Sequence, residues 1–233
     1  MLMVLAIVII VSGALIVGAL WGLYGKLPTK LEGFLVAVAG GALVLSAVSE
    51  LIEPAVETSS ILVALIWTLA GASIFTGADY VIDKKWGKSR GGGLLAAITL
   101  DGIPENLALG VVLIGAEPLE VAALAGSILL SNLPEAAGGA KEMAANDTDK
   151  SKALMLWGAA AFILSAAAIA GNLLLTEAGN TTLAAIKCLA GGAVIASLAT
   201  EVFPKAYNED RNLAGLATAL GFLLALWLSQ LGK

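Results

Sequence analysis

The chain has 233 residues, of which 59% are hydrophobic and 13% are charged, and its formal net charge is −5. Soluble domains carry about 25% charged residues, so this composition predicts an integral membrane protein. The single cysteine, Cys188, excludes a disulfide framework, and the lack of histidine removes the commonest transition-metal ligand and proton shuttle. Basic residues are too sparse for a nucleic-acid-binding patch, so we expect no nucleic-acid partner.

Eight apolar segments follow one another along the chain, each long enough to cross about 30 Å of hydrocarbon as a helix. They lie near residues 3–22, 31–53, 60–82, 93–115, 119–141, 153–176, 182–204 and 212–231. The first segment lacks a basic leader and is too long for a signal peptide, so we interpret it as a membrane-spanning helix. We therefore expect an all-α integral membrane protein with eight transmembrane helices in the lipid bilayer.

Basic residues gather in the connections that follow the odd-numbered segments. These connections hold eleven of the thirteen lysines and arginines: Lys26, Lys30, Lys84, Lys85, Lys88, Arg90, Lys141, Lys150, Lys152, Lys205 and Arg211. The even-numbered connections hold none. Because cytoplasmic loops are enriched in Lys and Arg, we expect the basic connections to be cytoplasmic and both termini to be extracytoplasmic. A prokaryotic cytoplasmic membrane is the expected location.

The second and seventh segments share a motif. Residues 39–55 read AGGALVLSAVSELIEPA and residues 190–206 read AGGAVIASLATEVFPKA, at an offset of 151 that aligns Glu50 with Glu201. The same offset carries the first and third segments onto the sixth and eighth, and five helices separate the copies, so the second copy is inverted. Inverted repeats are typical of secondary transporters, although a duplication without transport is an alternative. We expect one transporter domain over 1–233 in a 3+2+3 arrangement: a first repeat at 1–90, a central helix pair at 91–145 and the inverted repeat at 146–233.

The fourth and fifth segments carry two Pro-Glu motifs, LDGIPENLALG at 100–110 and LSNLPEAAGGA at 130–140. Side chains three or four residues apart share a helical face. Pro104 and Pro134 each free a backbone carbonyl four residues earlier, which needs a partner within the membrane. If the two helices are antiparallel neighbours, they bring polar oxygens together near mid-membrane, from Asp101, Glu105, Ser131, Asn132 and Glu135.

No lysine, arginine or histidine occurs between residues 91 and 140. One charged residue at a helix centre costs roughly 2.5 to more than 10 kcal/mol, so three acids there must be protonated, hydrated or neutralised by a cation. Oxygen ligands favour Mg²⁺, Mn²⁺ or Ca²⁺, with Fe²⁺ next, whereas Zn²⁺ is more often held by His and Cys. We predict a divalent cation as the substrate (Mn, Fe, Zn, Cd or Mg) and no required cofactor. The alternative is that protonated acids merely hold two kinked helices together.

Glu50 and Glu201 are a second pair of candidates. The predicted topology places Glu50 near the outer end of its helix and Glu201 near the inner end of its own. We interpret them as gate or vestibule carboxylates on either side of the central site. Each alone is equally well explained as a solvated acid at a helix end.

These features resemble the ZIP (Zrt/Irt-like) divalent-metal transporters over essentially the whole chain, most specifically in DGIPENLALG and SNLPEAAGGA. The family's fourth-helix motif reads His-Asn-x-Pro-Glu-Gly; here Asp101 stands at the histidine position, Gly102 at the asparagine position and Glu105 at the ligating glutamate. The resemblance implies that the ligand positions of the fifth-helix motif fall on Ser131, Asn132 and Glu135. It further implies a carrier that moves divalent metals, typically inward, by alternating access.

Departures from the family pattern change the expected site. The first metal subsite becomes all-oxygen, because an aspartate replaces histidine and glycine offers no side-chain ligand. Some family members hold a second metal with added acidic ligands, and here the sixth helix offers only Ser165 and Asn172 before Glu177. The resemblance therefore implies an altered metal preference and leaves a second subsite open.

Other functions also remain open. The same acids would suit a proton- or organic-cation-coupled carrier, or a membrane protein that binds metal without transporting it. An intramembrane enzyme would need paired carboxylates as acid and base, but the chain has no Cys–His pair, no Gly-x-Gly-Asp element and no arginine cluster, so we expect no enzyme. Small residues on the second and seventh segments would pack either within the protomer or across a homodimer.

Overall fold

The computed structural model describes residues 1–86 and 91–231, and these residues are almost entirely helical. The elements in chain order are α1 (Leu2–Tyr24), α2 (Thr29–Ser46), the π-helical segment η1 (Ala47–Ile52), α3 (Glu53–Thr58), α4 (Ile61–Trp86), α5 (Gly91–Val112), α6 (Ala122–Ala145), α7 (Lys150–Leu174), α8 (Asn180–Ser197), the π-helical segment η2 (Leu198–Val202), α9 (Phe203–Glu209) and α10 (Ala214–Leu231). The described part of the chain contains no strand. The all-α prediction is confirmed.

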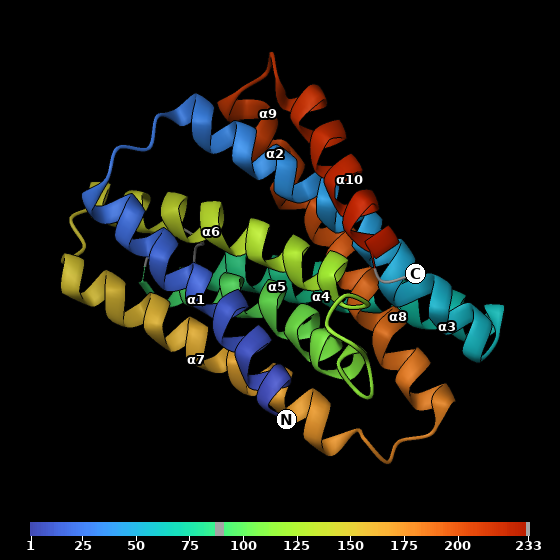
Figure 1. Ribbon diagram of the computed structural model, residues 1–233. Coiled ribbons are helices and arrows are strands. Elements are labelled where there is room, and N and C mark those ends of the chain that lie inside the picture. Colours follow the sequence, from blue (N-terminus) through green and yellow to red (C-terminus); the bar gives the residue numbers. More distant parts are fainter. Residues whose placement is uncertain (87–90, 232–233) are drawn as a thin grey trace.

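Within the described residues, the helices form eight long rods, because α2, η1 and α3 continue into one another, as do α8, η2 and α9 (Figure 1). Lys88 and Arg90, which the sequence assigns to a basic connection, lie outside the described residues, as does the predicted repeat boundary at residue 90. Asp149 caps α7, where its carboxylate accepts hydrogen bonds from the backbone N–H groups of Ser151 and Lys152.

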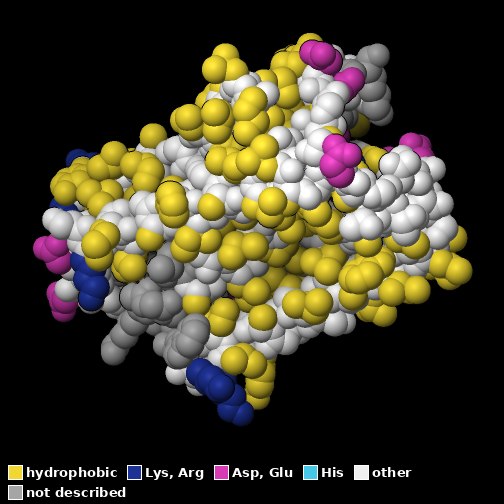
Figure 2. Space-filling view, turned by 90° about the horizontal axis from the view of Figure 1, so that it is seen from below, with side chains coloured by type: hydrophobic (Ala, Val, Ile, Leu, Met, Phe, Trp, Pro, Cys, Tyr) yellow, Lys and Arg dark blue, Asp and Glu magenta, His cyan; other side chains and the backbone are white. Residues whose placement is uncertain are grey.

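In the part of the chain that the structure describes, six of the rods are long and apolar enough to cross a membrane, judged by length and composition: Leu2–Tyr24, Thr29–Thr58, Ile61–Lys85, Lys150–Leu174, Asn180–Glu209 and Ala214–Leu231. The other two rods, α5 and α6, carry the Pro-Glu motifs. Figure 2 shows hydrophobic side chains spread over much of one face, with most of the charged side chains near its margins. α4 and α10 expose large apolar side chains, among them Leu62, Leu65, Ile66, Leu69, Leu216, Leu220, Leu223 and Trp227. Such helices are typical of a membrane-embedded protein.

Side-chain contacts gather the connections at two ends of the bundle. At one end, the Lys150 ammonium lies 4.5 Å from the centroid of the Tyr24 ring, and Glu32 forms ion pairs of 2.9 Å with Lys141 and Lys205. We call this the basic end. At the opposite, acidic end, towards which both termini point in Figure 1, a hollow of about 320 Å³ is lined by Ser49, Glu50, Glu53, Pro54, Glu57, Glu120 and Ser229.

Helices that are distant in sequence form the main packing pairs. α1 packs chiefly against α6, α2 against α10, α4 against α8 and α5 against α7. Glycines permit two of these close approaches, since a Cβ atom at Gly41 would meet the Thr218 backbone and one at Gly192 would meet the Thr68 backbone. Small residues at such crossings let membrane helices pack backbone to backbone. Gly41 and Gly192 are separated by the same 151 residues as the two AGGA motifs.

Two π-helical segments interrupt rods at positions that are also 151 residues apart. η1 begins at Ala47 and η2 at Leu198, and each contains one of the paired glutamates, Glu50 or Glu201. A proline follows in the first turn of α3 and of α9. Proline has no N–H to donate and crowds the preceding turn, which accounts for irregular backbone just before it. π-Helical turns are frequent at functional sites.

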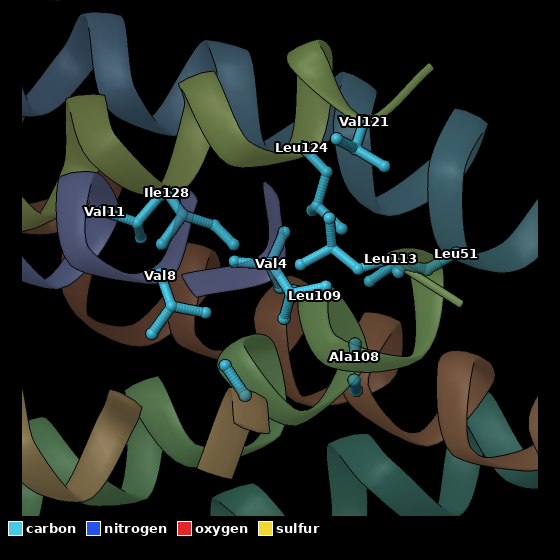
Figure 3. Close-up of a cluster of buried hydrophobic side chains, with 12 residues drawn as sticks. Val4, Val8, Val11, Leu51, Ala108, Leu109, Leu113, Val121, Leu124 and Ile128 are labelled. Atoms are coloured by element: carbon cyan, nitrogen blue, oxygen red, sulfur yellow. The ribbon is translucent and has the colours of Figure 1, made fainter. Parts of the chain in front are cut away.

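A buried hydrophobic cluster fills the interior of the half that leads to the acidic end (Figure 3). Its side chains come from the start of α1, from η1, from α5 and the residue that follows it, and from the start of α6, with alanines of α7 and α8 behind them. We call this cluster the apolar plug, and its larger members are Val4, Val8, Val11, Leu51, Leu109, Leu113, Val121, Leu124 and Ile128. Packed side chains therefore close the interior on the side of the acidic hollow.

Candidate cation site

A cavity of about 100 Å³ lies between α2, α5, α6 and the η2–α9 segment. We call it the central cavity. Pockets for drug-sized ligands span about 300–1,000 Å³, so this space suits a metal ion with a few ligands or waters better than an organic molecule. Its lining residues are Val36, Ala39, Leu43, Asp101, Ser131, Pro134, Glu135, Glu201, Val202 and Lys205.

The acidic side chains of the cavity come from three separate elements. Asp101 lies on α5, Glu135 on α6 and Glu201 on η2. α5 and α6 touch only over a short stretch, because each packs mainly against another helix. Both helices run through their internal prolines, Pro104 and Pro134, without a break. The structure thus brings the predicted residues Asp101, Ser131 and Glu135 to one cavity, together with Glu201.

Four carboxyl groups and one ammonium group interact electrostatically around this cavity. Glu135 is repelled by Asp101 and Glu201 and attracted by Lys205. Glu105 is repelled by Asp101 and Glu135. Because neighbouring like charges in a buried site disfavour full ionisation, the group favours the uptake of protons or of a cation.

Glu105 is buried, with 6% of its surface exposed, and it does not line the central cavity. Within the described part of the chain, no donor forms a hydrogen bond with its Oε1 atom. An orphaned polar atom in a buried position is uncommon and often marks a functional site. The neighbouring Asn106 is also buried; its Nδ2 donates to the Gly102 carbonyl at 2.9 Å, while its Oδ1 has no donor among the described residues. Sequence reasoning missed Asn106.

The two predicted ligands at the start of the second motif have different surroundings. Asn132 is buried, and its Nδ2 donates a 3.0 Å hydrogen bond to the Val11 carbonyl of α1. It is not a lining residue of the central cavity. Ser131 does line the cavity; its hydroxyl donates to the Ile128 carbonyl at 3.0 Å, which leaves its oxygen available as an acceptor.

The paired glutamates Glu50 and Glu201 lie in separate hollows. Glu50 lines the acidic hollow, where the Ser49 hydroxyl donates a 3.1 Å hydrogen bond to its Oε1, and Lys187 of α8 attracts it. Glu201 lines the central cavity. The apolar plug, which includes Leu51 beside Glu50, occupies the interior toward the acidic end.

No ready-made metal centre is present in the described part of the chain. No group of three or more His, Cys, Asp or Glu side chains is arranged there to hold a metal ion. Asp101, Glu105 and Glu135 share one region but do not converge on a single point. A bound ion would therefore have to draw these side chains together or keep some of its waters.

Lys205 is the feature of the cavity that sequence reasoning missed. The sequence places no basic residue between residues 91 and 140, the stretch that holds both Pro-Glu motifs, and Lys205 reaches the acids from α9 instead. Lys205 lies four residues after Glu201, and residues four apart share a helical face. This spacing indicates that Lys205 lies on the same side of the helix as Glu201.

Comparison with protein-family models and with curated proteins found no match to the chain. The fold and the site define an all-helical protein with long apolar helices and an acid-lined internal cavity. Beyond that class, the function rests on the chemistry of the cavity.

Proposed function

We propose that the protein is a ZIP-like transporter that moves divalent metal cations across a membrane, toward the cytoplasm, by alternating access. The central cavity carries this proposal, because it places Asp101, Glu135 and Glu201 inside a bundle of apolar helices, with the buried Glu105 next to them. Acids at membrane depth are costly unless a proton, water or a cation neutralises them, and they mark ion pathways.

The membrane arrangement belongs to the same proposal. α5 and α6 have 22 and 24 residues, which suffices for a span of about 20 residues. With them the chain has eight spans in the 3+2+3 inverted arrangement. Supporting observations are the 151-residue offset shared by Gly41 and Gly192 and by η1 and η2. The ion pairs of Glu32 with Lys141 and Lys205 bring basic residues together at one end of the bundle. Because cytoplasmic connections are enriched in basic residues, this supports a cytoplasmic basic end and extracytoplasmic termini.

The proposed ion ligands are oxygen atoms. Asp101, Glu135 and Glu201 supply carboxylates from three sides of the cavity, and the Ser131 hydroxyl adds a neutral oxygen. Glu105 interacts electrostatically with Asp101 and Glu135 and would have to move to join them as a ligand. Asn132 does not line the cavity; its hydrogen bond to the Val11 carbonyl fixes α6 against α1. A site of this kind favours Mn²⁺, Fe²⁺ or Mg²⁺ over Zn²⁺ and Cd²⁺.

In this proposal, the observed conformation represents the state in which the cavity communicates with the basic end. The central cavity extends from Asp101 to Lys205, whose ion pair with Glu32 lies at that end. The apolar plug separates the cavity from the acidic hollow. Alternating access requires a second state in which the plug opens and the contacts at the basic end close.

Uptake of Mn²⁺ into proteoliposomes tests the proposal. We expect the double variant Glu105→Gln and Glu135→Gln to lose roughly nine-tenths or more of the initial uptake rate, because it removes two negative charges from the ion pathway without a large change in shape. Glu142→Gln is the control, since Glu142 is an exposed acid on the same helix as Glu135 and does not line the cavity. Undiminished uptake by the double variant would exclude this site.

Other outcomes of the same assay identify the alternatives. Metal-free transport that follows a pH gradient would indicate a proton- or organic-cation-coupled carrier. Binding of Mn²⁺ without flux would indicate a metal sensor or scaffold. Competition with Fe²⁺, Zn²⁺, Cd²⁺ and Mg²⁺ measures selectivity, and a tight preference for Zn²⁺ or Cd²⁺ would contradict the oxygen-ligand assignment.

A further inference from the structure

Lys205 belongs both to the central cavity and to an ion-pair network at the basic end. Its Nζ lies 2.9 Å from Glu32 Oε1 and 4.0 Å from Glu209 Oε1, and it also attracts Glu135. Glu32 is buried, and its second oxygen, Oε2, binds Lys141 at 2.9 Å. One ammonium group therefore links the cavity acids to a buried carboxylate that two lysines share.

The backbone of α6 leaves space for this ammonium group beside Glu135. A Cβ atom at Gly138 would meet Glu32 Oε1 and would lie 2.7 Å from Lys205 Nζ. Gly138 is three residues beyond Glu135, so both lie on one face of α6. The positive charge thus sits about one helical turn from the proposed ligand.

Glu32 does not neutralise both of its lysines. Two ammonium groups share a single carboxylate, and the additional acid near Lys205, Glu209, is at the longer distance of 4.0 Å. Lys205 is the member of the pair that lines the cavity. A dication in the cavity would therefore face the acids and, at the same time, a fixed positive charge.

We propose that Lys205 is a specificity- and release-determining residue, a tethered positive charge that weakens the binding of a divalent cation to the cavity acids and so favours its release at the basic end. This inference rests on the proposed transport function. A dication interacts with a fixed charge twice as strongly as a monovalent ion does, so Lys205 penalises divalent binding more than monovalent binding. Transport needs such weakening, because a site that holds its ion too tightly releases it slowly.

Lys205→Gln and Lys141→Gln form a matched pair for the test. Both lysines bind Glu32 at 2.9 Å, and both have side chains that are 38% exposed, but Lys141 does not line the cavity. We expect Lys205→Gln to lower the dissociation constant for Mn²⁺ roughly tenfold in calorimetric titrations of the full-length protein in detergent, and to slow release of bound Mn²⁺ to a similar degree. Lys141→Gln should stay within about twofold of the wild type, and Lys205→Arg, which keeps the charge, should do the same.

Glu32→Gln provides a change of opposite sign. It removes the carboxylate that pairs with the Lys205 ammonium group, so the positive charge interacts more strongly with the cavity acids. We therefore expect Mn²⁺ binding to weaken several-fold. The fitted stoichiometry separates a change in affinity from a loss of folded protein. Equal shifts in Lys205→Gln and Lys141→Gln, or weaker binding in Lys205→Gln, would overturn the inference. Failure of the transport function itself would appear differently, as a wild-type protein that binds Mn²⁺ in these titrations but shows no uptake into proteoliposomes.

Discussion

Buried side-chain amides show how single residues divide between holding the fold and forming the cavity. Asn132 of α6 donates to the Val11 carbonyl of α1, and Asn172 of α7 donates to the Gly110 carbonyl of α5 at 3.1 Å. Each amide thus links one of the main helix pairs. Ser131 lies next to Asn132 in sequence but points to the central cavity.

Asn132 and Ser131 should therefore respond to substitution in opposite ways. We expect Asn132→Ala to lower the free energy of unfolding by about 1–3 kcal/mol, because it leaves a buried carbonyl without its donor, and to change the Mn²⁺ dissociation constant by less than about twofold. Ser131→Ala should weaken Mn²⁺ binding several-fold with little loss of stability. Denaturation in detergent and calorimetry measure the two effects. A tenfold loss of Mn²⁺ affinity in Asn132→Ala would instead support the sequence-based assignment of this amide as a ligand.

Residue spacing anticipated part of the candidate site. The motifs indicated that Asp101 and Glu135 belong together, and both line the same cavity. Spacing within a helix identifies a face, but it does not say which other helices close that face. For this reason Lys205 and Glu201, which reach the cavity from another rod, were not assigned to the central site.

Glycine crossings and π-helical segments occur in pairs at the level of the helices. Gly41 meets α10, and Gly192 meets α4, each at backbone distance. η1 and η2 interrupt the corresponding rods. If the chain contains two copies of one three-helix unit, equivalent changes should have equivalent effects.

Gly41→Ala and Gly192→Ala test this equivalence. Each added methyl group would collide with backbone atoms, of Thr218 or of Thr68, so we expect each variant to lose about 1–3 kcal/mol of stability in detergent unfolding. Gly158→Ala on α7 is the control, because a Cβ atom there meets nothing within 4 Å. A clear loss in only one of the two variants would argue against equivalent packing in the two copies.

Two of the rods are longer than the sequence predicts. The apolar pattern predicts that the second segment ends near residue 53 and the seventh near residue 204, but the rods continue to Thr58 and Glu209. Prolines usually mark helix ends, yet Pro54 and Pro204 fall in the first turn after a π-helical segment, where a missing N–H is tolerated. Apolar periodicity does not reveal such a segment, because it describes side chains and not the backbone hydrogen-bond pattern.

At the scale of the whole molecule, the charged ends give an orientation that can be tested. The basic end holds ion pairs of Lys141 and Lys205, whereas the acidic hollow lies at the end of the termini. We expect a C-terminal alkaline phosphatase fusion to be active and a C-terminal green fluorescent protein fusion to be dark in bacterial cells, because the proposed topology places the C-terminus outside the cytoplasm. If the green fluorescent protein fusion is fluorescent and the alkaline phosphatase fusion is inactive, the C-terminus is cytoplasmic. The orientation and the direction of uptake would then be opposite to those proposed.

The position of the apolar plug predicts which side of the membrane reaches the cavity. In a Cys188→Ala background, Val202→Cys should react with a membrane-impermeant thiosulfonate in inside-out vesicles and remain unreactive in right-side-out vesicles. Leu124→Cys, in the plug, should react in neither preparation. If Leu124→Cys reacts in right-side-out vesicles and Val202→Cys does not react in inside-out vesicles, the state open toward the acidic end predominates in the membrane.

The pairing of distant helices also has a consequence for biosynthesis. Each of the first four rods finds its chief neighbour among the last four: α1 with α6, α2 with α10, α4 with α8 and α5 with α7. A growing polypeptide emerges from the ribosome in chain order, so the early helices enter the bilayer before their neighbours have been made. Contacts between distant segments form late and leave incomplete chains open to misassembly. Assembly of the bundle is therefore expected to wait until α10, the neighbour of α2, has been synthesised.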